Sequence, residues 1–382
     1  MTEDTQRVCS VCVMDGRIAP LVFDANGQCN CCRAAIARKR DEYFPNAEGD
    51  RRMLALVKQL RQQGCGRRYD AMIGLSGGID SAYLAHVMRT RFGLRLLAVH
   101  VDGGWNSEAA VHNIERLVTV LGIDLHTHVI EWEEMRGLQL AFLRAGVLNQ
   151  DIPQDHAFFA TLYRLAPAFG IRTFLSGVNF STESVSQSGG GYPSIDGRHL
   201  RSIHRRFGTT ALRDFPILTV PRYLWLTRIQ RRPAIVHPLN WLPYDKTEAH
   251  ADLRLHYVWK EYGTKHSESR FTKFYQEIYL PDKTGFDKRR LHLSALIVSG
   301  QITRAEAMVE LATPILDPRQ KKFDIRYVAK KLQISPEELA RMIAAPLVPH
   351  STYPGDIWLL QWMHSLRNFW RKLKLLFEFR NV

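Results

Sequence analysis

The sequence predicts a doubly wound α/β fold with a mostly parallel sheet, preceded by a cysteine-rich module and followed by a helical C-terminal extension. Short apolar runs alternate with helical segments between residues 69 and 176, and a glycine-rich turn directly follows the first of these runs. Five of the six cysteines lie between Cys9 and Cys32. Alternation of strands with helices of about 10–15 residues is typical of a parallel sheet covered on both faces.

The individual elements follow from the hydrophobic period, taken in chain order. A charged helix is expected over residues 51–63, ahead of a buried strand at 69–75. Strands are then expected at 94–101, 125–132 and 172–176, and helices at 82–92, 107–121, 133–148 and 155–169. The glycine- and serine-rich stretch 184–191 predicts a loop. After about residue 249 the strand signal fades, and short helices are expected at 302–312, 325–332 and 336–343.

The charge balance favours an anionic partner. Lysine and arginine total 52 against 38 acidic residues, which gives a net charge of +14. This excess does not choose between a nucleotide, a nucleic acid, a nucleotide-sugar and a membrane surface. No apolar run reaches the roughly 18 residues of a membrane span. The N-terminus opens acidic and polar, unlike a signal peptide, so we expect a cytoplasmic protein.

The cysteine cluster predicts a metal site. Cys9 and Cys12 form one CxxC pair, and Cys29 and Cys32 form a second after a short loop. Two such pairs can place four thiolates in a tetrahedron, which suits Zn²⁺, with an iron–sulfur cluster as the alternative. Cys31 is a fifth candidate ligand. Four protein ligands leave no open position for substrate, so the site is expected to be structural. We therefore divide the chain into a zinc-ribbon module at 1–45, an α/β domain at 46–250 and a mainly helical region at 251–382.

The turn at residues 76–81, Ser-Gly-Gly-Ile-Asp-Ser, predicts a phosphate-binding loop. It lies between a predicted strand and a predicted helix, where backbone N–H groups and the positive end of the helix attract anions. Asp80 would repel a bare phosphate, which indicates a magnesium ion carried by the nucleotide. The chain has neither GxxxxGK[ST] nor GxGxxG, so a P-loop kinase and a dinucleotide-dependent oxidoreductase are not indicated. The alternative is an ordinary strand–helix turn.

This loop resembles the SGGxDS signature of the PP-loop ATP pyrophosphatase superfamily. The resemblance implies an adenine nucleotide alpha hydrolase-like fold with ATP and Mg²⁺ as cofactors. It also implies that the loop holds the β,γ-pyrophosphate as leaving group while a substrate oxygen attacks the α-phosphorus, forming an AMP ester. The loop residues that would bind ATP are Ser76, Gly77, Gly78, Asp80 and Ser81, with Asp80 also a catalytic candidate.

Two later strand ends and one lysine complete the expected ATP site. His100 and Asp102 follow the second predicted strand, where the superfamily binds adenosine. The segment 176–184 resembles a second phosphate loop, in which Glu183 would assist magnesium. A lysine after residue 245 could reach the phosphates as a point charge. Ordinary turn residues and a solvated lysine are the alternatives. The candidates outside the first loop are His100, Asp102, Gly177, Asn179, Glu183 and the catalytic candidate Lys246.

A more specific resemblance, to the N-acetyl sugar amidotransferase family, covers most of residues 9–312. It is carried by CxxCVMD from Cys9, NGxCxxC from Asn26, GxNFxTES from Gly177, KHSESRFTKFYQ from Lys265 and GFDKRR from Gly285. The resemblance implies a role in surface-polysaccharide or flagellar-glycan biosynthesis. It implies that ATP activates the acetamido oxygen of an N-acetylated bacterial sugar and that ammonia replaces it, giving an acetamidino group. Candidate substrate-binding residues are Lys265, Glu268, Arg270, Lys288 and Arg289, with His266 as a candidate catalytic base and surface ion pairing as the alternative.

Expected partners follow from what the chain lacks. Residue 2 is threonine and no cysteine lies beyond Cys65, so no glutaminase nucleophile is evident. The resemblance implies a separate glutaminase subunit and an ammonia-channel partner. Residues 358–382 have the spacing of a basic amphipathic helix, which could lie on the inner membrane surface or dock on the protein itself. The sugar substrate is expected to be nucleotide- or lipid-linked.

Two other functions remain open. A PP-loop tRNA-modifying enzyme would suit the basic charge, although Cys65 alone lies outside the metal cluster, which counts against sulfur transfer. Lysidine-type chemistry needs no cysteine. A non-catalytic zinc-ribbon nucleic-acid adaptor would make no use of the loop at 76–81. We do not expect nucleic acid to be the partner.

Overall fold

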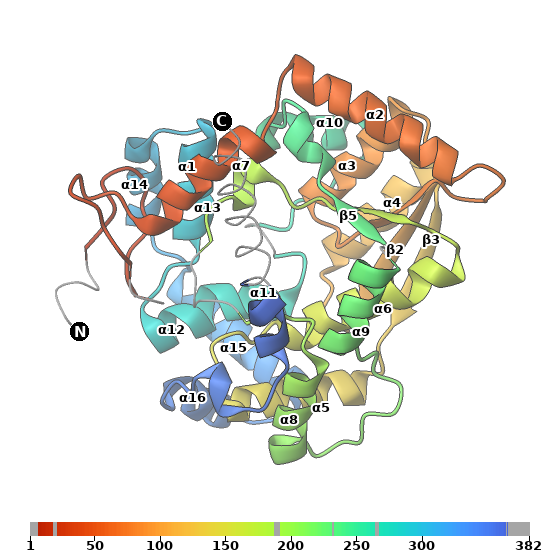
Figure 1. Cartoon of the computed structure of the whole chain (residues 1–382). Helices are drawn as coiled ribbons and strands as arrows, with labels where there is room; N and C mark the ends of the chain where they lie inside the picture. Colours follow the sequence, from red (N-terminus) through yellow and green to blue (C-terminus); the bar gives the residue numbers. More distant parts are fainter. Residues whose placement is uncertain are drawn as a thin grey trace, which may run out of the picture.

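The centre of the protein is a five-stranded parallel sheet, as seen in a computed structural model that describes residues 7–17, 21–186, 192–230, 233–263, 267–363 and 365 (Figure 1). The strand order is β3-β2-β1-β4-β5, and every pairing is parallel. The predicted fold class is therefore confirmed. The strands are β1 (Ala71–Gly74), β2 (Leu96–Asp102), β3 (Asp124–Val129), β4 (Thr173–Leu175) and β5 (Ala234–Val236).

Strand β1 is the point at which the chain changes direction across the sheet. It pairs with β2 on one side, where Ile73 lies opposite Ala98, and with β4 on the other, where Ile73 lies opposite Leu175. In an open parallel sheet the loops that leave such neighbouring strands diverge to opposite faces. A crevice then forms at the carboxyl ends of the strands, and it is the usual ligand site.

Helices cover both faces of the sheet, as the strand residues require. Side chains alternate along β1, so Ile73 joins the apolar cluster on one face and Met72 the cluster on the other. The first cluster includes residues of α2 (Ala47–Gln63), α3 (Ile79–Thr90), α4 (Glu108–Leu121) and α10 (Lys246–Tyr257). The second includes residues of α6 (Ile152–Ala168). Buried apolar residues on both faces of one strand are typical of a doubly wound sheet.

The region after α10 is helical, as predicted. One continuous helical stretch runs through α11 (Arg270–Phe274), a π-helical segment η4 (Tyr275–Tyr279) and α12 (Leu280–Thr284). The remaining helices are α1 (Asn30–Glu42), α5 (Trp132–Ala145), α7 (Phe180–Glu183), α8 (Gly197–Phe207), α9 (Val220–Leu224), α13 (Arg289–Ser299), α14 (Arg304–Ala312), α15 (Pro318–Leu332) and α16 (Pro336–Ala344), with a π-helical turn at Trp225–Ile229 and short 3-10 turns at Pro238–Trp241 and His350–Thr352.

Several elements were not predicted, among them helices α1, α10 and α13, strand β5 and helix α8. Strand β5 has three residues at the sheet edge and follows a basic stretch, which hid its apolar character. Helix α8 is rich in arginine and histidine, and only a few of its side chains, such as Leu200 and Ile203, are buried. The predicted loop at 184–191 and the predicted basic helix at 358–382 lie largely outside the described residues. Within the described part of the chain, no helix combines the length and apolar character needed to cross a bilayer. The division into three domains stays a prediction.

Candidate active site

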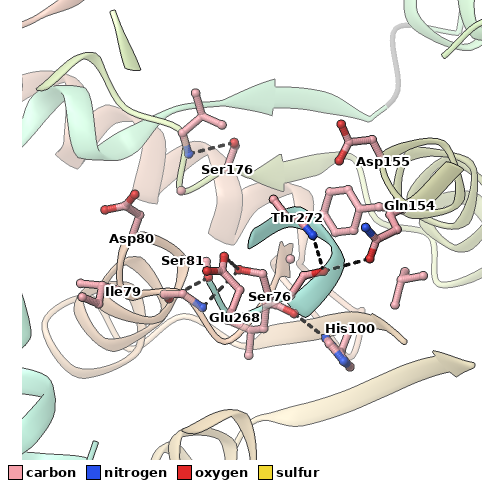
Figure 2. Close-up of a pocket in the computed structure, with 18 of the residues that line it drawn as sticks. Ser76, Ile79, Asp80, Ser81, His100, Gln154, Asp155, Ser176, Glu268 and Thr272 are labelled. Carbon is pink, nitrogen blue, oxygen red and sulfur yellow. Dashed lines mark hydrogen bonds between the residues drawn. The ribbon is translucent and has the colours of Figure 1, made fainter. Parts of the chain in front are cut away.

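A cavity of about 620 Å³ opens at the carboxyl edge of the sheet, beside the loops that follow β1 and β4 (Figure 2). Helix α6, helix α11, strand β5 and the segment after α10 supply its other walls. The structure therefore brings two predicted loops, separated by about a hundred residues, into one site. The predicted residues that line this cavity are Ser76, Gly78, Asp80, Ser81, His100, Gly177, Glu183, Lys246 and Glu268.

The loop after β1 directs the start of α3 toward the cavity. Gly77 has a φ of 86° and packs so tightly that an added Cβ would lie 2.7 Å from the Cβ of Ala110. Gly78 is the N-cap of α3 and has no side chain to cap the helix. The first amides of α3 therefore have no side-chain acceptor from the N-cap residue, an arrangement that attracts anions. In this structure the Ile79 N–H donates to the Tyr262 hydroxyl at 3.1 Å.

The loop after β4 is in contact with the first loop. A Cβ added to Gly177 would lie 2.8 Å from the backbone nitrogen of Ser81. Asn179 caps α7, because its side chain accepts a bond from the Thr182 N–H at 3.0 Å. This cap orients the short helix whose last residue, Glu183, lines the cavity. The second loop thus resembles the first in form, while Asn179 itself acts on the helix rather than on the cavity.

Carboxylates gather at the same end of the cavity. Asp80 accepts a hydrogen bond from the hydroxyl of Tyr244. Burial, together with the charge of Asp80, raises the pKa of Tyr244, so the phenol stays protonated as a donor. Glu268 comes from the C-terminal region, and its Oε1 accepts a bond from the Ser76 hydroxyl at 3.3 Å (Figure 2). Oxygen ligands of this kind suit Mg²⁺.

These carboxylates fit a magnesium ion that also uses phosphate oxygens. Among the described residues, only the four-cysteine group brings three or more potential ligand atoms within 4.8 Å of one another. Asp80, Glu183 and Glu268 thus face one cavity without forming a closed protein cage. Mg²⁺ in nucleotide sites normally takes one or two carboxylates, phosphate oxygens and water, which agrees with this donor set.

The two predicted residues at the end of β2 have separate positions. His100 lines the cavity, but its Nδ1 lies 2.7 Å from the Leu75 carbonyl oxygen and its Nε2 lies 2.9 Å from the Asn106 amide nitrogen. This pairing assigns Nδ1 as the donor, since a carbonyl oxygen can only accept. Asp102 does not line the cavity; its Oδ1 accepts a bond from the Gly104 N–H at 2.7 Å. Both side chains thus organise the loop between β2 and α4.

Most of the predicted substrate residues lie away from the cavity. Arg270 places its guanidinium 5.1 Å from the ring centre of Tyr327. Arg289 pairs with Asp287 at 2.7 Å and donates to residues at the end of α14. Lys288 precedes α13 and does not line the cavity. Lys265 and His266 fall outside the described residues.

Sequence patterns missed one whole wall of the cavity, formed by α6 and α11. Along α6, Asp155, Phe158 and Phe159 line the cavity at helical spacing. Packed against the start of α6, α11 and η4 supply Thr272 and Gln276. An amphipathic helix with acids in its first turn looks like any capped helix. The only available signal was that these acids stand on the side of α6 that also carries aromatic residues.

Two aspartates at the start of α6 have raised pKa values. Asp151 is buried, and both its burial and the charge of Asp155 raise its pKa well above the usual range. Asp155 faces the open cavity, but the surrounding protein partly removes it from water and raises its pKa to about 6. The Ser194 hydroxyl, at 3.2 Å, and the charge of Lys288 partly oppose this rise. Perturbed acids in a cavity are typical of functional sites.

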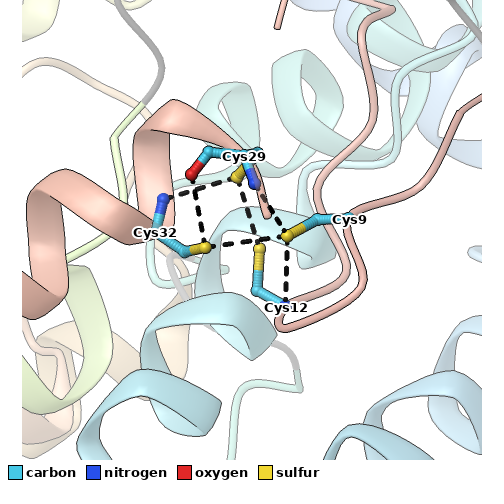
Figure 3. Close-up of side chains that lie close together, drawn as sticks. All are labelled: Cys9, Cys12, Cys29 and Cys32. Atoms are coloured by element: carbon cyan, nitrogen blue, oxygen red, sulfur yellow. Dashed lines mark hydrogen bonds between the residues drawn. The ribbon is translucent and has the colours of Figure 1, made fainter. Parts of the chain in front are cut away.

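The four predicted cysteine ligands form a compact buried group (Figure 3). The Sγ atoms of Cys9 and Cys32 are 3.6 Å apart, and those of Cys12 and Cys29 are 3.7 Å apart. Zn–S bonds of about 2.3 Å in a tetrahedron require sulfurs about 3.8 Å apart. The group therefore fits Zn²⁺. Cys31 is buried but lies outside this set of four.

The cysteine module is fixed to α13, α14 and α7 (Figure 1). Arg304 of α14 donates through Nε to the carbonyl oxygens of Cys9 and Cys12 at 3.3 and 3.2 Å. Tyr43, just after α1, stacks on Phe180 of α7 with ring centres 5.2 Å apart. Since α7 also carries Glu183, the cysteine module supports one wall of the cavity from behind.

The fold and the cavity define a doubly wound α/β protein whose candidate ligand site lies at the switch point of the sheet. Residues 268–367 match a family described as the C-terminal domain of WbpG-like LPS biosynthesis proteins. The matched region begins at Glu268, so it includes the α11 wall of the cavity. This region is thus similar to a family of LPS biosynthesis proteins, which agrees with the predicted link to surface-polysaccharide biosynthesis. No curated protein matched the chain.

Solved structures give weaker similarities. The U34-tRNA thiolase NcsA from Methanococcus maripaludis, with its [4Fe-4S] cluster, is 14% identical, covers 80% of this chain and 89% of its own, and has a TM-score of 0.34. The NH3-dependent NAD synthetase from Campylobacter jejuni is 15% identical, with coverages of 78% and 98% and a TM-score of 0.32. NMN synthetase from Francisella tularensis is 16% identical, with coverages of 58% and 92% and a TM-score of 0.28. Similarities with TM-scores this low do not indicate what this chain does.

Proposed function

We propose that the chain is an ATP-dependent amidotransferase that forms AMP and pyrophosphate and acts on an N-acetylated sugar in LPS or O-antigen biosynthesis. In the proposed reaction the acetamido oxygen attacks the α-phosphorus of ATP and pyrophosphate leaves. Ammonia then adds to the activated carbon and AMP departs, which leaves an acetamidino group. The observation that carries the proposal is the single cavity that joins the glycine loop at 76–81 to the wall supplied by the WbpG-like domain.

The chain's own residues would divide the binding of ATP between them. The loop amides, the Ser76 and Ser81 hydroxyls and Lys246 would hold the two terminal phosphates. The apolar side chain of Ile235, on the β5 side of the cavity, would provide a wall for the adenine. Fixed dipoles and charges around a leaving pyrophosphate lower the barrier without a protein nucleophile.

Magnesium and zinc have different roles in this proposal. Mg²⁺ would neutralise the charge of the phosphates, held in part by Asp80, Glu183 and Glu268. Zn²⁺ would be held by the four buried cysteines, a closed set that leaves no position for substrate. Zinc therefore supports α7 and α13 rather than taking part in the reaction.

Ammonia would come from a separate glutaminase through a channel partner. The enzyme would work in the cytoplasm, and the basic segment at 358–382 would recruit it to the inner membrane surface. All six cysteines lie in described parts of the chain, and none lines the cavity. This disfavours glutamine hydrolysis by a cysteine at the site. It also disfavours the tRNA thiolation alternative, because a sulfur carrier would need a cysteine there. Lysidine-type chemistry needs no such cysteine.

The test is a product assay with the full chain, Mg-ATP, ammonium chloride and a panel of nucleotide-linked and free N-acetylated sugars. We expect AMP and pyrophosphate to form only with the correct sugar, whose mass should change by the exchange of O for NH. Formation of ADP and phosphate would overturn the adenylation step. Stimulation of AMP formation by tRNA, with no response to any sugar, would favour the lysidine-type alternative.

A further inference from the structure

The cavity has two chemically different ends. Among the described residues that line it, Lys246 is the one lysine or arginine, and it also lines an adjoining pocket together with Ile79, at the start of α3. At the other end, α6 presents the carboxylate of Asp155 and the amide of Gln154 (Figure 2). Figure 2 shows Asp80 and Asp155 on opposite sides of the cavity. Phosphates should therefore bind at the loop, where Lys246, the first amides of α3 and a magnesium ion would offset the carboxylates of that end. At the α6 end no described lysine or arginine lines the cavity to offset Asp155.

The α6 end is a built surface held by hydrogen bonds between two distant segments. Asp151 Oδ1 accepts bonds from the Thr272 hydroxyl at 3.2 Å and from the Gln154 side-chain amide at 3.3 Å. The Gln154 carbonyl oxygen in turn accepts a bond from the Ser269 hydroxyl at 3.1 Å. This network fixes α11 against α6. Asp155, one turn further along α6, keeps its carboxylate toward the open volume.

The WbpG-like region is also fixed to the sheet through its backbone. The Ser107 N–H donates to the Glu268 carbonyl oxygen at 2.8 Å, and the Arg270 N–H donates to the Trp105 carbonyl oxygen at 2.8 Å. Asn106 and Ser269 form an antiparallel bridge between these two bonds. The α11 wall is thus set at a fixed distance from the loops, as a binding surface requires.

We propose that the α6–α11 end of the cavity binds the uncharged, hydroxyl-rich part of the acceptor, with Asp155, Gln154 and Thr272 as positioning and specificity-determining residues. This inference rests on the proposed function, because it assigns the acceptor to one end of the same cavity. Carboxylate, amide and hydroxyl side chains match the hydroxyl and amide donors of an N-acetylhexosamine ring. They do not match a diphosphate carrier, which should extend toward solvent.

The test maps both ends in one experiment, by hydrogen–deuterium exchange of the full chain. One arm contains Mg²⁺ with a non-hydrolysable ATP analogue, and the other contains N-acetylglucosamine, N-acetylgalactosamine or N-acetylmannosamine. We expect the nucleotide to slow exchange at residues 76–81, and at least one sugar to slow it at 151–159 and 268–276. Asp155→Asn should weaken sugar binding about 10-fold, since it removes a charged acceptor, while leaving nucleotide binding unchanged.

Two further variants keep the result interpretable. Thr272→Val changes the opposite wall and should also weaken sugar binding without an effect on the nucleotide. Asp41→Asn makes the same chemical change as Asp155→Asn on an exposed part of α1, and should alter neither ligand. Sugar protection elsewhere or nowhere, with the nucleotide still at 76–81, would overturn this inference alone. Absence of the nucleotide from 76–81 would overturn the proposed function, and the sugar arm would still locate the acceptor.

Discussion

The cysteine module and the cavity are both clusters of polar side chains, but their groups point in different directions. In the cysteine module, four sulfurs face one another, and Arg304 uses the nearby carbonyl oxygens. In the cavity, side chains such as Asp155 and Lys246 face an open volume of about 620 Å³. One metal ion would satisfy all four sulfurs of the cysteine module, whereas the side chains of the cavity need a larger molecule, such as a nucleotide, as their partner. The spacing of residues in the sequence predicted nearly all of the cysteine module but only some of the residues that line the cavity.

The largest expected effect is on the closed region. Cys12→Ser should abolish stoichiometric zinc and lower the free energy of unfolding by several kcal/mol, because the binding free energy of a structural zinc, about 10 kcal/mol or more, is also folding free energy. Metal analysis and thermal unfolding would measure this. Cys65→Ser, at an exposed position outside the cluster, should change neither. Full zinc content and an unchanged Tm in Cys12→Ser would show that the cysteine module does not depend on a bound metal.

Acid should act on the cavity wall through His156. This buried residue lies next to Asp155; its Nδ1 is 2.5 Å from the Ser194 carbonyl oxygen, and its Nε2 accepts a bond from the Leu218 N–H at 3.0 Å. Burial lowers its pKa to about 4. The unfolded chain, with a pKa near 6.5, therefore binds the proton first as pH falls. Stability from this group is complete above about pH 6.5 and should fall by about 1.4 kcal/mol per pH unit, or about 3 kcal/mol in all, by pH 4.

The matched variant is His156→Gln, whose amide can keep both hydrogen bonds but does not titrate in this range. Thermal unfolding at pH 7 and pH 5 should show a smaller loss of Tm in the variant than in the unmodified chain. This comparison separates the histidine from any release of metal, which both proteins would share. Equal losses would show that the α6 wall does not depend on an uncharged His156.

Asp80→Asn should slow AMP formation about 100-fold, equivalent to about 2.7 kcal/mol, because it removes one charge that would hold the magnesium at the leaving group. The Tm should change little, because the amide can still meet the Tyr244 hydroxyl. Tyr244→Phe, which leaves the carboxylate in place, should have a smaller effect on rate. A rate within two-fold of the unmodified chain in Asp80→Asn would place the phosphates away from the loop.

The smallest expected effect comes from adding one methyl group to the loop at residue 77. Gly77→Ala should weaken ATP binding about 10-fold, since a positive φ costs an alanine about 1–2 kcal/mol and the new Cβ would press on Ala110. Isothermal titration would measure the affinity. Gly66→Ala is the control, because Gly66 has a φ of 70° but no atom within 4 Å of an added Cβ. It should lose only the stability that the positive φ costs, and it should keep its affinity for ATP.

Local signals explain why part of the site could be predicted. The glycines at 77 and 78 and the following helix lie within a few residues, so their geometry follows from the sequence. The cysteine pairs are likewise local, and the short loop between them brings them together. The strand alternation up to β4 was clear for the same reason, whereas β5, with three residues after a basic stretch, offered too little pattern.

The missing wall depends on contacts that no local pattern contains. Asp151 and Thr272 are bonded although 121 residues separate them. The start of α6 looks like an ordinary acidic helix cap until α11 is placed against it. Two further candidates, Arg289 and Arg270, are paired with Asp287 and Tyr327 in the structure, and their role toward a ligand stays a prediction. The charge of a residue in the sequence does not show such pairings in advance.

The backbone bridge between residues 105–107 and 268–270 has a consequence for how such a chain could diversify. It joins the segment after residue 267 to the loop between β2 and α4 through main-chain bonds, which tolerate many side chains. If the proposed function holds, substitutions in the segment after residue 267 would change one side of the acceptor end without moving the loop at 76–81.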